Sequence, residues 1–416
     1  MIVRRYSTAI ILAFMVLFGL SGFTLLAFRD GPFRLNTFLL GTALVVYIIA
    51  QYTILTSVFR HMDRLALLIT DFLVIVGMTM LYRLNPDTCL KQFVWLLAGT
   101  VAMIVTLIVI RRSKDFGRWN VFFMILAVGM LGLTLLLAQT TGGARNWLRI
   151  GPFSFQPSEF AKILFLIVTA FYLSTRERKR DLWPYFLFTI LCVLLLVAAR
   201  DLGAALLFAG TFLIVFYVAT GDAVITLAAI AAFAGGAVLS YKMFAHVRTR
   251  VEVWLDPWAD YNNKGFQVVQ GLLAIASGGL LGTGLGNGMP TSIPVAESDY
   301  IFAAICEEYG IIVALALIGF YILFIVRGGI IAMAARTRFE KLLVFGATCL
   351  LALQSFIIIG GVIKLIPLTG ITMPFVSYGG SSMIASMMVL GIIEGVAVKN
   401  GEKDELEITE MGGGVE

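Results

Sequence analysis

The chain has 416 residues, of which 60% are hydrophobic and only 13% are charged, and its mean hydropathy is +0.95. A soluble protein of this length could not bury so much apolar surface, so we expect most of the chain to lie in lipid. The net charge of +6 does not indicate nucleic-acid binding, because the basic residues lie in short turns between apolar segments. These properties predict one polytopic helical bundle and exclude a series of soluble domains.

The first apolar segment follows Arg4 and Arg5 and ends at Phe28. Arg29 and Asp30 come next, where a signal peptide would have a small-residue cleavage site, so we interpret this segment as an uncleaved anchor.

Further apolar segments of roughly 20 residues, the length needed to cross a bilayer, follow along the chain. The predicted fold class is therefore an all-α polytopic membrane protein with about twelve transmembrane helices and one long extracellular loop. The least distinct boundary is at Arg200 and Asp201. The predicted spans are residues 8–28, 37–59, 65–83, 92–110, 119–138, 159–174, 183–199, 202–219, 223–241, 301–326, 342–364 and 374–397.

The turns between these spans differ in charge from one side to the other. Basic residues gather on the side of the N-terminus, in the segments 60–64, 111–118, 175–180 and 336–341. The positive-inside rule then predicts that both termini are cytoplasmic and that the loop 242–300 is extracellular. The tail, residues 399–416, has little apolar content and is predicted to be disordered.

The histidines and cysteines of the chain do not indicate a metal site or a disulfide framework. His61 and His246 are far apart in the sequence, and the four cysteines are scattered without a CxxC pair. We therefore expect no histidine-based metal cluster, and we interpret the cysteines as buried apolar residues.

The long loop contains two unusual segments. GFQVVQGLLAIAS (265–277) has the length of an interfacial or re-entrant piece. The glycine-rich run 278–288 resembles a phosphate-binding loop only superficially, because it lacks the preceding strand and following helix that such a loop requires.

A first candidate site is the segment 142–163, where Ser158 is a plausible N-cap of an apolar helix. Arg145, Arg149 and Lys162 would then surround an outward-facing helix N-terminus, an arrangement that binds anions such as the pyrophosphate of a lipid-linked substrate. The alternative is that these cations are snorkelling side chains beside Trp147.

A second candidate site is Asp299 with Glu307 and Glu308. A straight helix from 299 to 326 would be about 42 Å long and would project beyond the roughly 30 Å hydrocarbon core. Asp299 and Glu307 would share one face of it, and Asp299 would be a candidate general base. The alternative is that Asp299 simply caps the helix. Asp256, in a turn before Pro257, ranks second for the same role.

Asp201, at the outer start of a predicted helix, is either a cap or a partner of Arg200.

Five motifs in the same order resemble the SEDS family of shape, elongation, division and sporulation proteins (RodA/FtsW/SpoVE). They are GARNWLRIGPFSFQPSEFAKI (143–163), DLGAAL (201–206), GFQVVQGLLAIASGGLLGTGLGNG (265–288), ESDYIFAAICEEYG (297–310) and LIPLTGITMPFVSYGGSS (365–382). The resemblance implies a ten-helix core over residues 63–398, with residues 1–62 forming two additional helices.

The resemblance also implies an activity. Members of this family polymerise the disaccharide units of lipid II into peptidoglycan at the outer face of the bacterial cytoplasmic membrane and release undecaprenyl pyrophosphate. Asp299 matches the essential aspartate of the family. Substrate binding is expected from a larger group: Arg145, Trp147, Glu159, Lys162, Asp256, Glu307, Ser377 and Ser381.

The implied partners are a class B penicillin-binding protein, which is a transpeptidase with a single transmembrane span, and other elongation or division machinery. A divalent cation (Mg or Mn) is a possible cofactor, although the sequence contains no dedicated set of ligands for it.

Two other functions are compatible with the sequence. One is a lipid II flippase or secondary transporter, since twelve helices is a common number for transporters. The other is a scaffold that only recruits partners.

Overall fold

The structure is a computed structural model that describes residues 2–29, 31–113, 119–141, 144–150, 153–175 and 179–412. Eleven of the described helices are long and apolar enough to cross a membrane, and each predicted span coincides with one of these or with the shorter α7. The spanning helices are α1 (Ile2–Phe28), α2 (Leu35–Val58), α3 (Arg64–Leu84), α4 (Pro86–Arg112), α5 (Asn120–Leu137), α6 (Pro157–Thr175), α7 (Trp183–Ala198), α8 (Leu202–Thr220), α9 (Ala223–Met243), α12 (Ile301–Ala334), α13 (Arg338–Val362) and α14 (Gly380–Gly412). The predicted fold class is confirmed.

Polar residues in the turns fix where several of these helices begin. The side chain of Asp63 accepts hydrogen bonds from the backbone N–H groups of the first turn of α3, and Asn85 does the same for α4, just before Pro86. Thr337 and Glu340 form a reciprocal capping box at the start of α13. The apolar runs therefore begin and end where the sequence supplies these caps.

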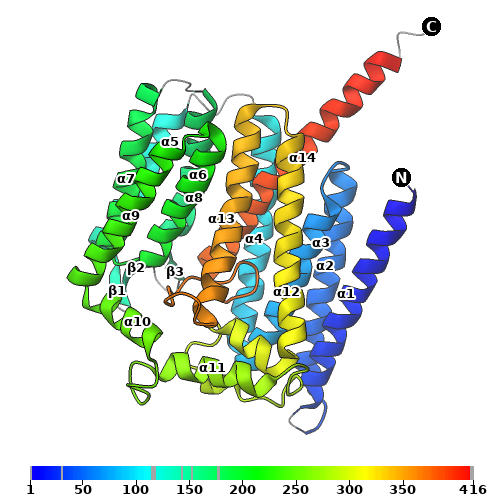
Figure 1. The fold of residues 1–416 in the computed structure, drawn as a ribbon. Helices are drawn as coiled ribbons and strands as arrows, with labels where there is room; N and C mark the ends of the chain where they lie inside the picture. The colour runs from blue at the N-terminus through cyan, green and yellow to red at the C-terminus, as the bar shows by residue number, and fades with distance from the viewer. Residues whose placement is uncertain are drawn as a thin grey trace.

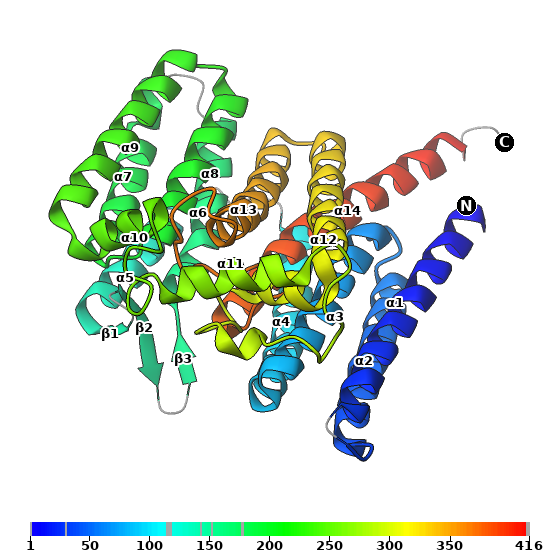
Figure 2. The same cartoon turned by 60° about the horizontal axis from the view of Figure 1, so that its bottom comes forward.

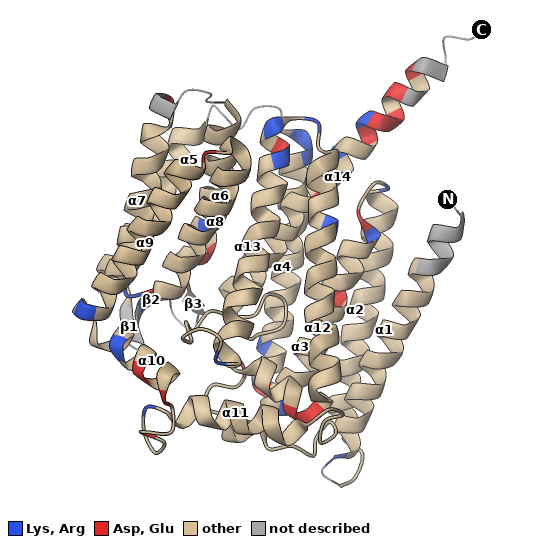
Figure 3. Ribbon diagram, viewed as in Figure 1, with Lys and Arg blue, Asp and Glu red and all other residues tan. Residues whose placement is uncertain are grey.

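Both termini lie at one end of the bundle (Figure 1). At the other end, α10 (Ala245–Leu255) and α11 (Phe266–Gly278) lie across the helices, as the turned view in Figure 2 shows. The segment 265–277 thus forms a helix at the bundle end, as its apolar length suggested. Charged residues concentrate near the two ends (Figure 3), and the middle of the bundle is mostly apolar.

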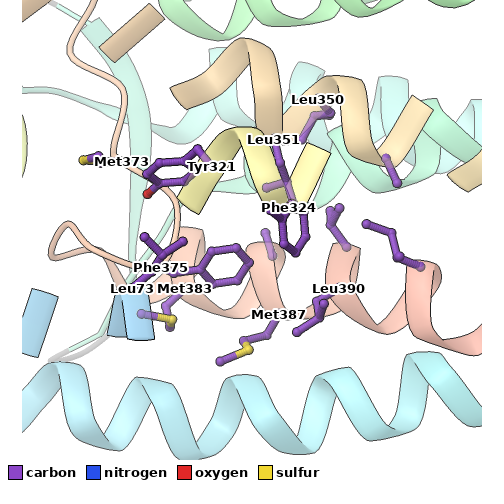
Figure 4. Close-up of a cluster of buried hydrophobic side chains, with 14 of the residues drawn as sticks. Leu73, Tyr321, Phe324, Leu350, Leu351, Met373, Phe375, Met383, Met387 and Leu390 are labelled. Carbon is purple, nitrogen blue, oxygen red and sulfur yellow. The ribbon is translucent and has the colours of Figure 1, made fainter. Parts of the chain in front are cut away.

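The core lies around α14, which packs along α4 and also contacts α6, α12 and α13. Figure 4 shows Phe324 of α12 beside Leu351 of α13, while Met387 lies on the side of α14 that faces α4. The hydroxyl of Tyr321 donates to the carbonyl of Pro374, which anchors the segment between α13 and α14 to this core. The site at the bundle end is thereby supported by rigid helices.

A small antiparallel sheet that the sequence analysis did not predict follows α5. It has the order β1 (Gln139–Thr141), β2 (Ala144–Ile150) and β3 (Phe153–Phe155), and Leu148 pairs with Phe155. The described part of the chain also contains two short 3-10 helices, η2 (Lys179–Leu182) and η3 (Pro290–Ser292). The three strands are short and paired with one another, so the hydrophobic pattern of a single strand was too brief to reveal them.

The predicted straight helix from 299 to 326 is wrong. The helix α12 begins at Ile301, and Gly310 has non-helical dihedral angles (φ 81°, ψ 169°) inside it. Backbone N–H groups of the glycine-rich run reach α12 at this break: Thr283 donates to Glu307 O, and Gly284 donates to Glu308 O. A Cβ atom on Gly282 would lie 2.3 Å from Glu308 O, so this run is rich in glycine because two backbones meet here.

The expected disorder of residues 399–416 is also wrong for residues 399–412, which continue α14 as a helix; residues 413–416 lie outside the described part. Ion pairs hold this extension against the ends of other helices. Arg336 binds both Asp404 and Glu407, and Arg111 binds Glu402 at 2.8 Å. The tail is therefore ordered by partners distant in sequence, which its low apolar content did not reveal.

Candidate functional site

A cavity of about 680 Å³ lies at the end of the bundle opposite the termini. It is surrounded by the starts of α6 and α8, by α10 and α11, by the turn before α12, and by the segment that follows α13. Its charged lining consists of Glu159, Lys162, Arg200, Asp201, Arg250, Lys264, Glu297, Asp299 and Lys364. The cavity brings together residues that are more than 200 positions apart in sequence.

Asp299 lies in this cavity, in the turn before α12 and not on the helix. Tyr300 is the N-cap residue, and it makes no side-chain cap, so the alternative that Asp299 simply caps α12 finds no support. The hydroxyl of Ser298 donates to Asp299 Oδ1 at 2.9 Å. Burial raises the pKa of Asp299, and Glu297 adds to this, while the Ser298 hydrogen bond and the positive charge of Arg250 oppose it. A carboxylate with a raised pKa is a stronger proton acceptor, which suits a general base.

Arg250, on α10, and Asp299 both lie close to Gly370. Its Nη1 donates to Thr369 O at 2.8 Å. A Cβ atom on Gly370 would lie 3.5 Å from Asp299 Oδ2 and 3.6 Å from Arg250 Nη2, and Gly370 has a φ of +74°, which favours glycine. The sequence analysis missed Arg250 as a site residue. Arg250, Val253 and Trp254 all line the cavity. Their spacing places them on one face of a helix, and this pattern could have indicated Arg250 as a site residue from the sequence.

Lys162 is placed differently from the expectation. It is buried on α6, and its Nζ donates to Glu159 Oε2 at 2.5 Å and to Gln354 Oε1 at 3.1 Å. Lys162 and Glu159 both line the cavity, but their charges largely neutralise each other. Since α6 begins at Pro157, Ser158 lies inside its first turn and accepts a hydrogen bond from the Gln156 amide instead of capping the helix.

Around the start of α6, Trp147 lines the cavity from β2, whereas Arg145 is exposed and lies outside the lining. The backbone N–H of Arg145 donates to Ala199 O, which fixes β2 against the end of α7. The side chain of Arg149 lies outside the described residues. Asp201 caps α8 through the N–H of Ala204, which is one of its two predicted roles.

The other predicted residues support the neighbouring loops and are absent from the described cavity lining. Ser377 donates to Ser298 O at 2.6 Å, beside Asp299, and Ser381 accepts from the N–H of Gln156. Glu307 accepts from the N–H of Met289, and Asp256 accepts from the N–H of Trp258.

Glu308 is buried in an ion pair with Arg83 of α3, whose Nη2 also donates to Gly288 O. This pair ties the end of the glycine-rich run to the bundle core, outside the described lining of the cavity.

The cavity also contains backbone strain. Arg200, Val295 and Lys364 all line it and all have φ between 56° and 63°, a region that non-glycine residues rarely occupy. The carbonyl of Lys364 accepts from Trp254 Nε1 at 3.0 Å, which joins α10 to the segment after α13. Such strain persists only where the surroundings enforce it, and it is common at functional sites.

Within the described residues, no group of three or more His, Cys, Asp or Glu side chains could hold a metal ion. The cavity therefore offers cations and separate carboxylates, together with apolar walls such as Phe208 and Leu368. This combination can bind an anion, accept a proton at Asp299, and accommodate an apolar chain.

Comparison with known proteins agrees with this architecture. Residues 52–402 match the model of a family described as FtsW/RodA/SpoVE cell cycle proteins. The chain is 36% identical, over 362 residues, to the peptidoglycan glycosyltransferase RodA of Mycobacterium tuberculosis; the match covers 80% of this chain and 77% of that protein.

Two solved structures are also similar. One, from a study of how a peptidoglycan synthase complex coordinates polymerization and crosslinking, is 26% identical with a TM-score of 0.69, and the match covers 82% of this chain and 98% of the other. The rod shape determining protein RodA of Thermus thermophilus is 25% identical with a TM-score of 0.61, covering 81% of this chain and 96% of that one. These relatives favour a glycosyltransferase over the flippase or transporter considered above.

Proposed function

Because the chain belongs to the FtsW/RodA/SpoVE family, we propose that it is a peptidoglycan glycosyltransferase whose reaction takes place in the cavity around Asp299. The observation that carries this assignment is the position of Asp299 on the wall of a 680 Å³ cavity that several cations line. The substrate we propose is lipid II, which joins a disaccharide to an undecaprenyl chain through a pyrophosphate.

The proposed reaction transfers a glycan from one lipid diphosphate to another sugar. Asp299 accepts the proton of the acceptor hydroxyl as that oxygen forms a bond to the anomeric carbon of the donor. The bond between the anomeric carbon and the pyrophosphate oxygen breaks, and undecaprenyl pyrophosphate leaves with the bonding electrons. A single displacement of this kind inverts the anomeric carbon, as the family resemblance leads us to expect.

The leaving pyrophosphate gains negative charge, so cations at fixed positions would stabilise the transition state. Arg200, Arg250, Lys264 and Lys364 line the cavity and are the groups we assign to this role. They take the place that the sequence analysis gave to Arg145 and Lys162, since Lys162 is paired with Glu159 and Arg145 lies outside the lining.

The proposed orientation places the cavity at the outer face of the bacterial cytoplasmic membrane and both termini in the cytoplasm. The support is the charge of the turns: Arg111 and Arg112 end α4, and Arg336, Arg338 and Lys341 lie where α12 passes into α13, at the end of the bundle that carries the termini. Reactivity of single introduced cysteines toward a membrane-impermeant thiol reagent, in a background without the four native cysteines, would test it. Labelling at position 260 and protection at position 338 in intact cells is the expected result.

We also propose that the chain works with a class B penicillin-binding protein and with other elongation or division machinery. The support is the similar chain from a peptidoglycan synthase complex in which polymerization is coordinated with crosslinking. Co-purification with the cognate transpeptidase would test this partnership.

A divalent cation remains a proposal. The described residues do not provide a protein ligand set, so no step is assigned to a metal. Comparing turnover in a chelator with turnover in added Mg²⁺ or Mn²⁺ measures the requirement.

The central test is glycan polymerisation by the purified chain on labelled lipid II, with and without the transpeptidase. Asp299→Asn removes the proton acceptor with little change of shape, and we expect it to abolish polymer. Asp260→Asn is the matched control, because Asp260 is in the same loop but accepts only from neighbouring groups such as the Asn263 amide. Polymer from Asp299→Asn at the wild-type rate would refute the assignment. Movement of lipid II across vesicles by a protein that forms no polymer would support the flippase instead.

A further inference from the structure

A second cavity, of about 600 Å³, lies at the end of the bundle that carries the termini. It is surrounded by the ends of α4 and α6, the start of α13 and the polar extension of α14. The proposed glycosyl transfer makes no use of this cavity, which is at the far end of the spanning helices.

In the described part of the lining, basic residues outnumber acidic ones. The cavity is lined by Arg111, Arg112, Lys399 and Lys403 and by two carboxylates, Glu340 and Glu402. Each carboxylate already has a partner: Glu340 binds Lys399 at 2.8 Å, and Glu402 binds Arg111 at 2.8 Å.

Among the described lining residues, Arg112 and Lys403 are the remaining cations. Neither forms an ion pair with a carboxylate among the residues that the structure describes. They are therefore available to an anion that enters the cavity from outside the protein.

The rest of the lining is apolar. Ile110, Phe171, Phe339 and Leu343 line it from α4, α6 and α13; Ile110 and Leu343 are buried, and the two phenylalanine side chains are half-buried. Leu406 lines the cavity from the extension of α14 and is 63% exposed, although the residues around it are charged. A free phosphate ion needs only the cations, whereas cations above an apolar wall at the end of a membrane span suit a molecule with an anionic head and an apolar chain.

We propose that this cavity binds the phosphate headgroup of an anionic phospholipid. The phosphate lies between Arg112 and Lys403, and one acyl chain runs along Phe171 and Phe339. In the orientation proposed above, this lipid comes from the inner leaflet, where anionic headgroups are attracted to basic residues at the membrane surface. The bound lipid fills the space between α4, α6 and α13 and steadies the extension of α14.

The test measures lipid binding to the full chain directly. Purified protein in delipidated detergent micelles is titrated with phosphatidylglycerol or with phosphatidylcholine, and bound lipid is counted by native mass spectrometry. Wild-type protein is expected to retain phosphatidylglycerol in preference to phosphatidylcholine. The double variant Arg112→Gln/Lys403→Gln is expected to bind phosphatidylglycerol roughly thirty-fold more weakly, since each basic residue near an anionic lipid contributes about a factor of five.

The matched control is Arg60→Gln/Lys341→Gln. Both residues are exposed, lie at the same end of the bundle and are absent from the described lining, so this variant loses the same charge without altering the cavity. An equal loss of binding in the two double variants would overturn the proposal, because general surface attraction would explain it. Equal retention of phosphatidylcholine by wild-type protein would do the same.

A third experiment uses inorganic phosphate alone and distinguishes a lipid headgroup from a free phosphate ion as the ligand. If millimolar inorganic phosphate displaces the bound phosphatidylglycerol from wild-type protein, the site recognises a soluble anion and the lipid assignment fails. Polymerisation of lipid II is measured in parallel. A double variant that loses the lipid but still forms polymer leaves the proposed function intact, so the two proposals can fail independently.

Discussion

Replacing Arg250 by Gln should change the pH dependence of polymerisation. The carboxylate of Asp299 and the guanidinium of Arg250 both lie within 3.6 Å of the point where a Gly370 side chain would begin, so Asp299 Oδ2 and Arg250 Nη2 are no more than about 7 Å apart. At an effective dielectric constant of ~20, opposite charges at this distance interact by about 2 kcal/mol. That energy corresponds to a factor of about 30 in the fraction of Asp299 that is ionised at low pH.

The direction of the change in pH dependence follows from the effect of Arg250 on Asp299. Arg250 lowers the pKa of Asp299 against the effect of burial, so its removal raises that pKa further. Because a general base must be ionised, the acid limb of the rate profile should move to higher pH in Arg250→Gln. At pH values above the acid limbs of both the wild-type and the variant profile, Asp299 is ionised in both proteins. The loss of rate that remains there reports the interaction of Arg250 with the substrate.

The assay is the initial rate of lipid II polymerisation between about pH 4.5 and pH 9, in a buffer series of constant ionic strength. Lys264→Gln is the matched control. Lys264 lines the same cavity but is not among the charges that act on Asp299, so this variant should slow polymerisation without moving the acid limb. An acid limb that stays in place in Arg250→Gln, or that moves equally in Lys264→Gln, would refute the reasoning.

Three further experiments test the supporting structure. Glu308→Gln leaves the buried Arg83 without its counter-charge and should cost about 3–5 kcal/mol of unfolding free energy, read as a lower Tm in detergent, whereas an unchanged Tm would show that the ion pair is dispensable. Gly370→Ala and Gly221→Ala both force alanine into a positive φ at a cost of about 1–2 kcal/mol, but only Gly370→Ala should reduce kcat, because nothing lies within 4 Å of a Cβ at Gly221. Asp256→Asn should retain polymerisation, since Asp256 accepts from the N–H of Trp258 and is absent from the described lining; a loss as large as that of Asp299→Asn would restore Asp256 as a candidate base.

Local patterns were enough to predict much of the fold. Runs of apolar residues located twelve spans, and the boundary at Arg200 and Asp201 is correct because Asp201 caps α8. The position of Asp299, in a polar turn just before an apolar helix, was also visible in the chain order. Asp299 could therefore be singled out from the sequence alone, whereas the residues that hold its side chain in place could not.

The misplaced features depend on contacts between distant residues. Lys162 was predicted to bind an anion, yet Gln354, 192 positions away, helps Glu159 to hold its ammonium group. The tail was predicted to be disordered, yet Arg336 fixes it through Asp404, 68 positions away. A single helix was predicted through Gly310, but the glycine-rich run approaches from another part of the chain and breaks it.

The sequence by itself determined that this chain crosses a membrane many times and that one acid stands at the start of a late span, because hydrophobicity and helix capping act over a few neighbouring residues. Only the tertiary structure decided which cation faces that acid. Arg250 and Asp299 both lie close to Gly370, and the three come from segments that become neighbours only when the bundle is assembled. Electrostatic pairing depends on distance in space, and no local pattern records that distance.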